Sequence, residues 1–117
     1  MLATDEHSSP LQSLAVELLE RINAAYASLE SWPRAFAEGD VERIRTSLPA
    51  VSALSAFLES HSQDAISIIG TIALELWSGT DSYVEAGRSF VTGDLAGARA
   101  KWDSGNVAWA LASVAPT

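Results

Sequence analysis

Two histidines are the side chains of this sequence best suited to acid–base or metal chemistry, because imidazole titrates near neutral pH. His7 lies in a polar stretch at the N-terminus, where an unstructured group cannot be oriented for catalysis. His61 lies between Glu59 and Asp64, so these three side chains could form a polar cluster. It also falls on the apolar stripe of a predicted helix. We therefore interpret His61 as a histidine at the edge of the core, bonded to a neighbour.

Motifs for metal binding, nucleophilic catalysis and phosphate binding are missing from the sequence. The two histidines lack the i,i+4 spacing of a helical zinc site, and there is no Cys to complete one. No G-x-S-x-G positions a serine nucleophile, and no Lys follows a glycine-rich loop. We expect no catalytic residue, no metal site, no cofactor and no small-molecule substrate, so the protein is predicted not to be an enzyme. The carboxylates without such a motif are interpreted as a solvated face: Glu17, Glu20, Glu30, Glu38, Asp40 and Glu42.

The charge balance and the apolar pattern narrow the choice of partners. Fifteen acids against seven bases give a formal net charge of −8, which repels nucleic acid and anionic membrane surfaces. The longest apolar run, residues 66–77, is too short and too polar to span a bilayer. The N-terminus carries acids where a signal peptide needs bases. We predict a cytoplasmic protein, or one exported without a cleavable signal peptide. Its many Ala and its preference for Arg over Lys are typical of a GC-rich bacterial, for example actinobacterial, genome.

The N-terminal part of the chain has the signals of an amphipathic helix. We expect residues 1–8 to be a flexible tail and residues 9–117 to be one helical domain of ordinary size. Ser9, Pro10 and Gln12 form a capping box with proline at the first helical position, which predicts a helix from Pro10 to Ser31. Its apolar residues recur at steps of three and four: Leu11, Leu14, Ala15, Leu18, Ile22, Ala25 and Leu29.

The most apolar stretch, residues 65–90, keeps the same helical period, and the period extends upstream to Leu54. The pattern leaves open whether residues 50–92 form one long helix or several. One possibility is a turn at residues 59–62, with Ser62 as the cap of a new helix over Gln63–Ser78. The preferred break is at Gly79-Thr80-Asp81, because glycine costs about 1 kcal/mol inside a helix. The residues on this stripe are Leu54, Leu58, His61, Ala65, Ile69, Ile72, Leu76, Thr80, Tyr83, Gly87 and Phe90.

Shorter helices are predicted on either side of this stretch. Asp40 is expected to cap a helix over Val41–Ser47, which Pro49 interrupts or restarts. Asp94 is expected to cap a helix over Leu95–Asp103. A break at Gly105-Asn106 then separates a short final helix over Val107–Val114. Val and Ile follow helical and not alternating spacing, so we predict an all-α fold, an antiparallel helical bundle of four main helices plus a short C-terminal helix.

One pattern occurs twice, 54 positions apart. Phe36-x-x-Gly39-Asp40-Val41-x-x-Ile44-Arg45 is repeated as Phe90-x-x-Gly93-Asp94-Leu95-x-x-Ala98-Arg99. One interpretation is that both segments form the same helix–loop–helix corner and result from a duplication. The alternative is that Gly-Asp is simply a common way to end one helix and begin the next.

The aromatic and small residues are the best candidates for partner binding. Tryptophan concentrates binding energy at interfaces, and small residues let helices approach closely. The alternative is that both kinds of residue pack inside the chain. The residues assigned to partner binding are Trp77, Gly79, Tyr83, Phe90, Trp102 and Trp109.

Trp77-Ser78-Gly79 resembles the Trp-x-Gly turn of small helical-hairpin proteins exported by bacterial type VII (ESAT-like) secretion systems. The resemblance implies an acidic protein without cysteines that pairs as a homodimer or heterodimer. Tyr83 departs from the family's export signal, because Gly87 stands where that signal has an acid. The C-terminal half also resembles uncharacterised small actinobacterial proteins, through Leu54-x-x-Phe57 and the corner at 90–95.

These observations predict a non-enzymatic helical protein–protein interaction module, specifically a small partner protein similar to those of type VII secretion. Its partner would be a second copy or another helical protein. The alternative is an acidic intracellular binding protein, such as an immunity protein, an antitoxin or an adaptor, whose carboxylates cover a basic partner.

Overall fold

The computed structural model describes the backbone of residues 2–112 and the side chains of residues 10–112. Within this range the chain is helical and contains no strand, so the predicted all-α class is confirmed. The helices are α1 (Leu2–Glu30), α2 (Trp32–Glu38), α3 (Val41–Ser60), α4 (Ser62–Ile69), α5 (Ile72–Val91) and α6 (Leu95–Leu111).

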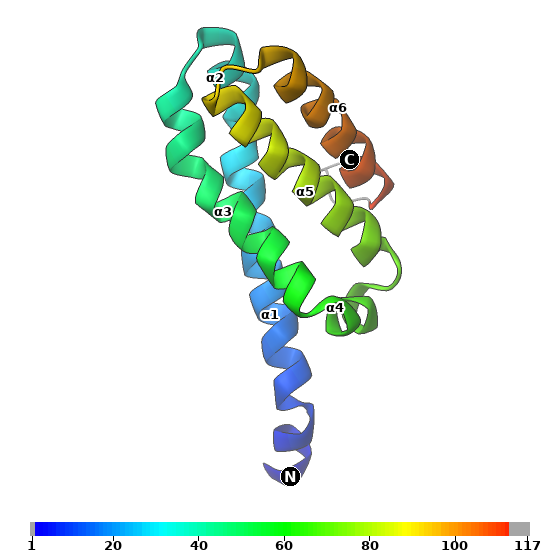
Figure 1. Ribbon diagram of the computed structural model, residues 1–117. Coiled ribbons are helices and arrows are strands. Elements are labelled where there is room, and N and C mark those ends of the chain that lie inside the picture. Colours follow the sequence, from blue (N-terminus) through cyan, green and yellow to red (C-terminus); the bar gives the residue numbers. More distant parts are fainter. Residues whose placement is uncertain (1, 113–117) are drawn as a thin grey trace.

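Each long helix packs on the long helix that precedes it in the chain and runs in the opposite direction (Figure 1). α3 packs on α1, α5 packs on α3, and α5 and α6 form the most extensive pair. The short helices lie at opposite ends, with α2 at the turn from α1 into α3 and α4 at the turn from α3 into α5 (Figure 1). The largest fully buried side chains come from α1, α2, α3 and α5: Leu18, Trp32, Ile44, Val51, Leu54, Leu58, Leu76 and Thr80.

The first helix differs from its prediction at its N-terminal end. α1 begins at Leu2 and contains Pro10, which was predicted to be the first helical residue. A proline inside a helix removes one backbone hydrogen bond and does not always end the helix. The expected flexibility of residues 1–8 stays a prediction.

The breaks in residues 50–92 occur at His61 and Gly70. His61 separates α3 from α4, and Gly70, with a φ of 79°, separates α4 from α5. α3 continues without a break through Pro49, where the sequence predicted an interruption or a restart. Residues 50–92 therefore belong to several helices and not to one long helix. These are α3, which begins before residue 50, α4 and α5.

Two glycine breaks predicted from the sequence were wrong. α5 continues through Gly79, and α6 continues through Gly105, so Val107–Leu111 belongs to α6 and forms no separate short helix. Residues 113 and 114 of that predicted helix lie outside the described residues. A Cβ atom on Gly79 would lie 2.5 Å from Trp109 Cδ1, and one on Gly105 would lie 2.6 Å from the Tyr83 ring. The two glycines therefore let α5 and α6 approach closely, and this packing offsets their low helix propensity.

The first Gly-Asp corner joins α2 to α3. Gly39 takes a left-handed conformation with a φ of 70°, which glycine adopts without strain. The backbone N–H of Asp40 donates to the Ala35 carbonyl at 2.8 Å. Its carboxylate Oδ1 accepts from the Arg43 N–H at 3.0 Å and so caps α3 as predicted.

The second corner, between α5 and α6, repeats this geometry. Gly93 has a φ of 91°, and the backbone N–H of Asp94 donates to the Ser89 carbonyl at 2.8 Å. The Asp94 carboxylate accepts from the Gly97 N–H at 2.9 Å. Each of these bonds has its counterpart 54 positions earlier, so the prediction that both segments form the same corner is confirmed. That the pair results from a duplication stays a hypothesis.

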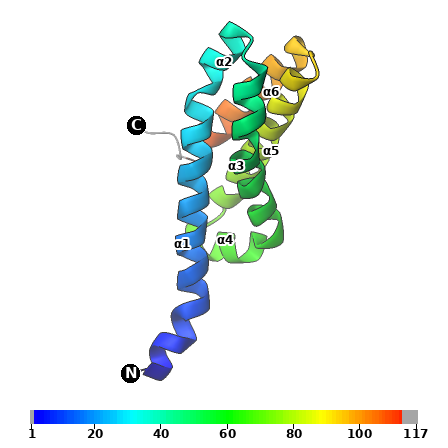
Figure 2. The same cartoon turned by 90° about the vertical axis from the view of Figure 1, so that its left-hand side faces the viewer.

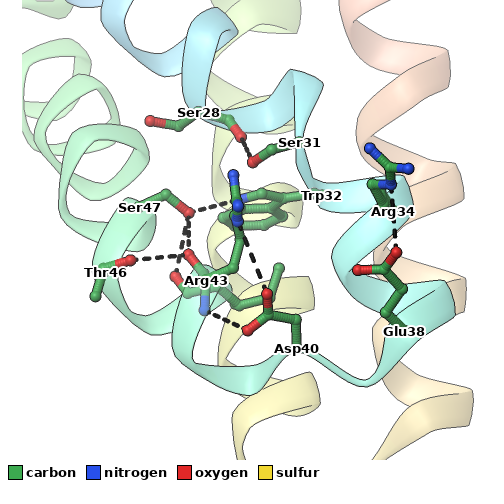
Figure 3. A network of polar contacts seen from close by, with 10 residues as sticks. Ser28, Ser31, Trp32, Arg34, Glu38, Asp40, Arg43, Thr46 and Ser47 are labelled. Carbon is green, nitrogen blue, oxygen red and sulfur yellow. Dashed lines mark hydrogen bonds and ion pairs between the residues drawn. The ribbon is translucent and has the colours of Figure 1, made fainter.

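A polar network holds α2 against α3 at the first corner (Figure 3). The buried Trp32 donates its indole N–H to Ser47 Oγ at 2.8 Å, and Ser47 Oγ donates to the Arg43 carbonyl at 2.6 Å. On the outer side of α2, Arg34 pairs with Glu38 at 3.3 Å. The indole is therefore both buried and satisfied, which a stable core requires.

Candidate interaction surface

Most of the residues that the sequence assigned to partner binding lie in the interior of this chain. Gly79, Tyr83, Phe90 and Trp109 are buried, and Trp102 is half-buried. The Tyr83 ring lies 5.0 Å from the Trp102 ring and 5.2 Å from the Trp109 ring, between centroids. These aromatic side chains fill the space beside α5, as the alternative interpretation held. Their contribution to partner binding stays a prediction.

Trp77 lies apart from this aromatic cluster. It is half-buried on α5, and its indole Nε1 is buried with no hydrogen-bond partner among the side chains and backbone that the structure describes. Trp77, Ser78 and Gly79 all lie inside α5 and form no turn. The tripeptide therefore does not act here as the turn that the resemblance implies.

Two side-chain hydrogen bonds join α5 to α6 within this cluster. The Trp109 indole N–H donates to Thr80 Oγ1 at 3.2 Å, and Thr80 Oγ1 donates to the Leu76 carbonyl at 2.6 Å. The Tyr83 hydroxyl donates to Asn106 Oδ1 at 2.6 Å. Burial raises the pKa of Tyr83 well above its usual range, because the phenolate would lose its hydration. These polar groups position the two helices relative to each other.

His61 occupies the core-edge position predicted for it. Its half-buried ring lies 4.7 Å from the Phe57 ring, and its Nδ1 lies 3.6 Å from Asp64 Oδ2. That distance is too long for a hydrogen bond. Among residues 10–112, no group of three or more His, Asp and Glu side chains could hold a metal ion.

Large exposed apolar residues occur on α1, α5 and α6 among the described residues, and three of them lie on α1. Val16 is 58% exposed, Leu19 is 59% exposed and Leu11 is 45% exposed. Val16 and Leu19 lie off the buried stripe of α1, whereas Leu11 continues that stripe toward the N-terminus. These three residues are named the α1 surface below.

Leu11 is exposed because α1 is longer than the helix it packs against. At about 1.5 Å per residue, the 29 residues of α1 span roughly 44 Å and the 20 residues of α3 roughly 30 Å. The described part of the molecule measures 55 × 26 × 24 Å. Both views show the first turns of α1 extending past α4, with no other described helix beside them (Figures 1 and 2). The apolar stripe of α1 thus continues beyond the part that this chain covers.

A shallow groove runs between α1 and α3 next to the α1 surface. It has a volume of about 780 Å³, and the small residues Ala24, Ala50 and Ala53 are among those that line it. Val16 also lines it, as do Glu17 and Arg21, which form an ion pair of 2.7 Å. Small residues in a groove allow a second helix to approach closely.

The sequence analysis missed the α1 surface, although part of the signal was present. Val16 and Leu19 are large apolar residues that fall outside the stripe of their own helix, which is visible in the sequence. Singly exposed apolar residues are common, so the pattern alone did not select them. Their grouping with Leu11 emerges only when the lengths of the packed helices are known.

No family model matches the chain, and no curated protein or solved structure that was searched matches it. Among the described helices, none is long and apolar enough to cross a membrane.

Proposed function

We propose that this protein is a non-enzymatic module that associates with a helical partner, in the first place a second copy of itself, through α1. In this proposal the four long helices form an antiparallel bundle, in which the other three hold α1 in a fixed orientation. The observation that carries it is the apolar stripe of α1, which extends to the exposed Leu11. The first turns of α1 extend past α4 (Figure 1). Val16 and Leu19 are further exposed apolar residues of the same helix.

The expected strength of this association follows from the exposed area. Burying a Val or Leu side chain completely contributes about 1.5–3 kcal/mol, so a half-exposed one contributes about 1 kcal/mol. Two copies related by a two-fold axis would bury six such side chains, or roughly 6 kcal/mol before the cost of association. Since about 6 kcal/mol corresponds to a dissociation constant of about 40 μM even before that cost, we expect a weak, reversible dimer with a dissociation constant of roughly 0.04–1 mM.

Sedimentation equilibrium over a wide concentration range tests the proposal. The wild-type chain is expected to shift from monomer to dimer as its concentration rises. Val16→Glu with Leu19→Glu should abolish the shift, because it places carboxylates on both copies beside Glu17 and Glu20. Both positions are exposed and Glu is a good helix former, so the helix content measured by circular dichroism should not change.

A matched control separates this surface from other exposed apolar residues. Val107 on α6 is 62% exposed, close to the value for Val16, and lies on a different helix. Val107→Glu adds the same charge and should leave the monomer–dimer equilibrium unchanged. A wild-type chain that stays monomeric at several hundred micromolar, or a dimer that Val107→Glu disrupts equally, would overturn self-association through α1.

The more specific proposal is a small partner protein similar to those of type VII secretion. It is supported by the all-α fold and by the resemblance at Trp77-Ser78-Gly79. That tripeptide forms no turn, so the resemblance is limited to its residue types, and the proposal also depends on the α1 surface. Export of the tagged chain that requires an intact secretion ATPase would support this version, and export independent of it would refute it.

A second candidate is an acidic protein that covers a basic partner. Five of the seven bases already pair with carboxylates of the same chain, so the surface keeps a surplus of negative charge. Association through such charges weakens steeply with salt, whereas burial of the α1 surface does not. Binding of a basic partner that disappears at moderate salt and is insensitive to the α1 variants would favour this candidate. The paired bases are Arg21, Arg34, Arg43, Arg45 and Lys101.

A further inference from the structure

A hollow of about 410 Å³ opens between α2, the C-terminal end of α5 and the first turns of α6. The two Gly-Asp corners, which begin α3 and α6, lie at the same end of the described part of the molecule as these elements (Figure 1). Part of its wall is aromatic: the Phe36 ring lies 4.9 Å from the Phe90 ring and 5.5 Å from the Trp102 ring. Phe36 and Trp102 are half-buried, so part of each ring faces the hollow from an incompletely covered position.

Arg99 is the one charged residue that lines this hollow. Among the side chains of residues 10–112, it makes no ion pair with a carboxylate. A guanidinium offers several N–H donors in one plane and binds a carboxylate through two parallel hydrogen bonds. The hollow therefore combines an aromatic wall with one uncommitted cation.

The first corner shows what Arg99 lacks. Arg45 occupies the equivalent position there, 54 residues earlier, and pairs with Glu42 at 2.7 Å. The residue equivalent to Glu42 at the second corner is Ala96. The same helix geometry thus holds an arginine with its acid at one corner and without it at the other. Only the second corner leaves the guanidinium open to an anion from outside.

We propose that this hollow binds a small organic carboxylate, whose apolar chain or ring packs on the aromatic wall and whose carboxylate pairs with Arg99. Ligand sites are typically cavities of about 300–1,000 Å³ with apolar walls and a few polar groups that fix orientation. This hollow lies near the lower end of that range, which suits a ligand with a chain of about eight carbons. The site is separate from the α1 surface and does not depend on the proposed association.

The experiment uses three probes that separate charge from apolar contact. Octanoate carries both features, 1-octanol keeps the chain without the charge, and acetate keeps the charge with almost no chain. Titration followed by ¹H–¹⁵N NMR is expected to shift the Trp102 indole and the Ala98 amide with octanoate, with a dissociation constant on the order of 0.1–1 mM. Octanol is expected to bind about tenfold more weakly, and acetate is expected not to bind.

Two variants test the charge of Arg99: one removes the guanidinium, and the other pairs it with a carboxylate of the same chain. Arg99→Gln removes the cation and should weaken octanoate about tenfold while octanol changes less than twofold. Ala96→Glu restores at the second corner the acid that Glu42 supplies at the first, and should weaken octanoate similarly by occupying Arg99. Arg45→Gln removes the paired arginine of the first corner and should have no effect. Both α6 positions are exposed, so the fold should persist.

Three results would overturn the proposal. The first is that octanoate leaves every resonance of the hollow unshifted at several millimolar, and the second is that octanol binds as tightly as octanoate. The third is an octanoate affinity that neither Arg99→Gln nor Ala96→Glu lowers. Because wild-type titration alone yields the first two results, the test does not depend on the variants folding.

Discussion

Replacing Gly79 with alanine tests whether α6 packs directly on α5 at the Trp77-Ser78-Gly79 tripeptide. At an open position inside a helix, glycine to alanine stabilises a protein by about 1 kcal/mol. At Gly79 the new methyl carbon would lie 2.5 Å from Trp109 Cδ1 and 2.9 Å from Ala108 Cβ. Non-bonded carbons prefer about 3.5–4.0 Å, so α6 or the Trp109 ring would have to move by roughly 1 Å.

Overpacking of this kind costs about 1–3 kcal/mol, which outweighs the gain in helix propensity. We expect Gly79→Ala to lower the free energy of unfolding by up to about 2 kcal/mol, measured by urea denaturation and circular dichroism. Ser78→Ala is the control, because Ser78 is exposed on the same helix turn and should change stability by less than about 0.5 kcal/mol.

A double-mutant cycle identifies which contact causes the loss of stability in Gly79→Ala. Ala108→Gly removes one of the two closest contacts, so Gly79→Ala should be less destabilising in that background by at least about 0.5 kcal/mol. If Gly79→Ala instead stabilised the protein by about 1 kcal/mol, and its effect added to that of Ala108→Gly, the packing described for α5 and α6 would be refuted.

Two further predictions concern the pH dependence and the corners. Tyr83 has a raised pKa in the folded state, so above about pH 10 the unfolded chain loses a proton that the folded chain keeps, and stability should fall by up to about 1.4 kcal/mol per pH unit. Tyr83→Phe should remove that part of the slope in denaturation curves at pH 9–11, and an unchanged slope would show that the hydroxyl is not protected. Asp40→Ala and Asp94→Ala should each cost about 1 kcal/mol, since each removes the same type of cap. Thermal unfolding that is unaffected by one of them would contradict the equivalence of the two corners.

Local signals in the sequence were sufficient to predict the helices and the helix caps, which depend on residues close to one another in the chain. The recurrence of apolar residues at steps of three and four predicts helices, because residues three and four positions apart lie on the same face of an α-helix. Asp40 and Asp94 were predicted as caps, and each accepts the expected backbone N–H. A cap involves residues only three positions apart, so no knowledge of the fold was needed.

The α1 surface and the hollow between α2, α5 and α6 could not be predicted from such local signals. Val16 and Leu19 could be recognised as apolar residues off the stripe, but only the shorter α3 leaves Leu11 uncovered. The contrast between Glu42 and Ala96 could be read by aligning the two repeats. That Arg99 lines a hollow follows only from the packing of α2, α5 and α6.

The sequence alone therefore determined that the chain is helical and where aspartates cap its helices, because those properties depend on short-range hydrogen bonds and on the period of one helix. The tertiary structure decided which glycines end a helix. Gly70 ends one, whereas Gly79 and Gly105 lie where two helices meet. The physical reason is that the cost of an interior glycine is local, while the packing that offsets it comes from residues more than twenty positions away.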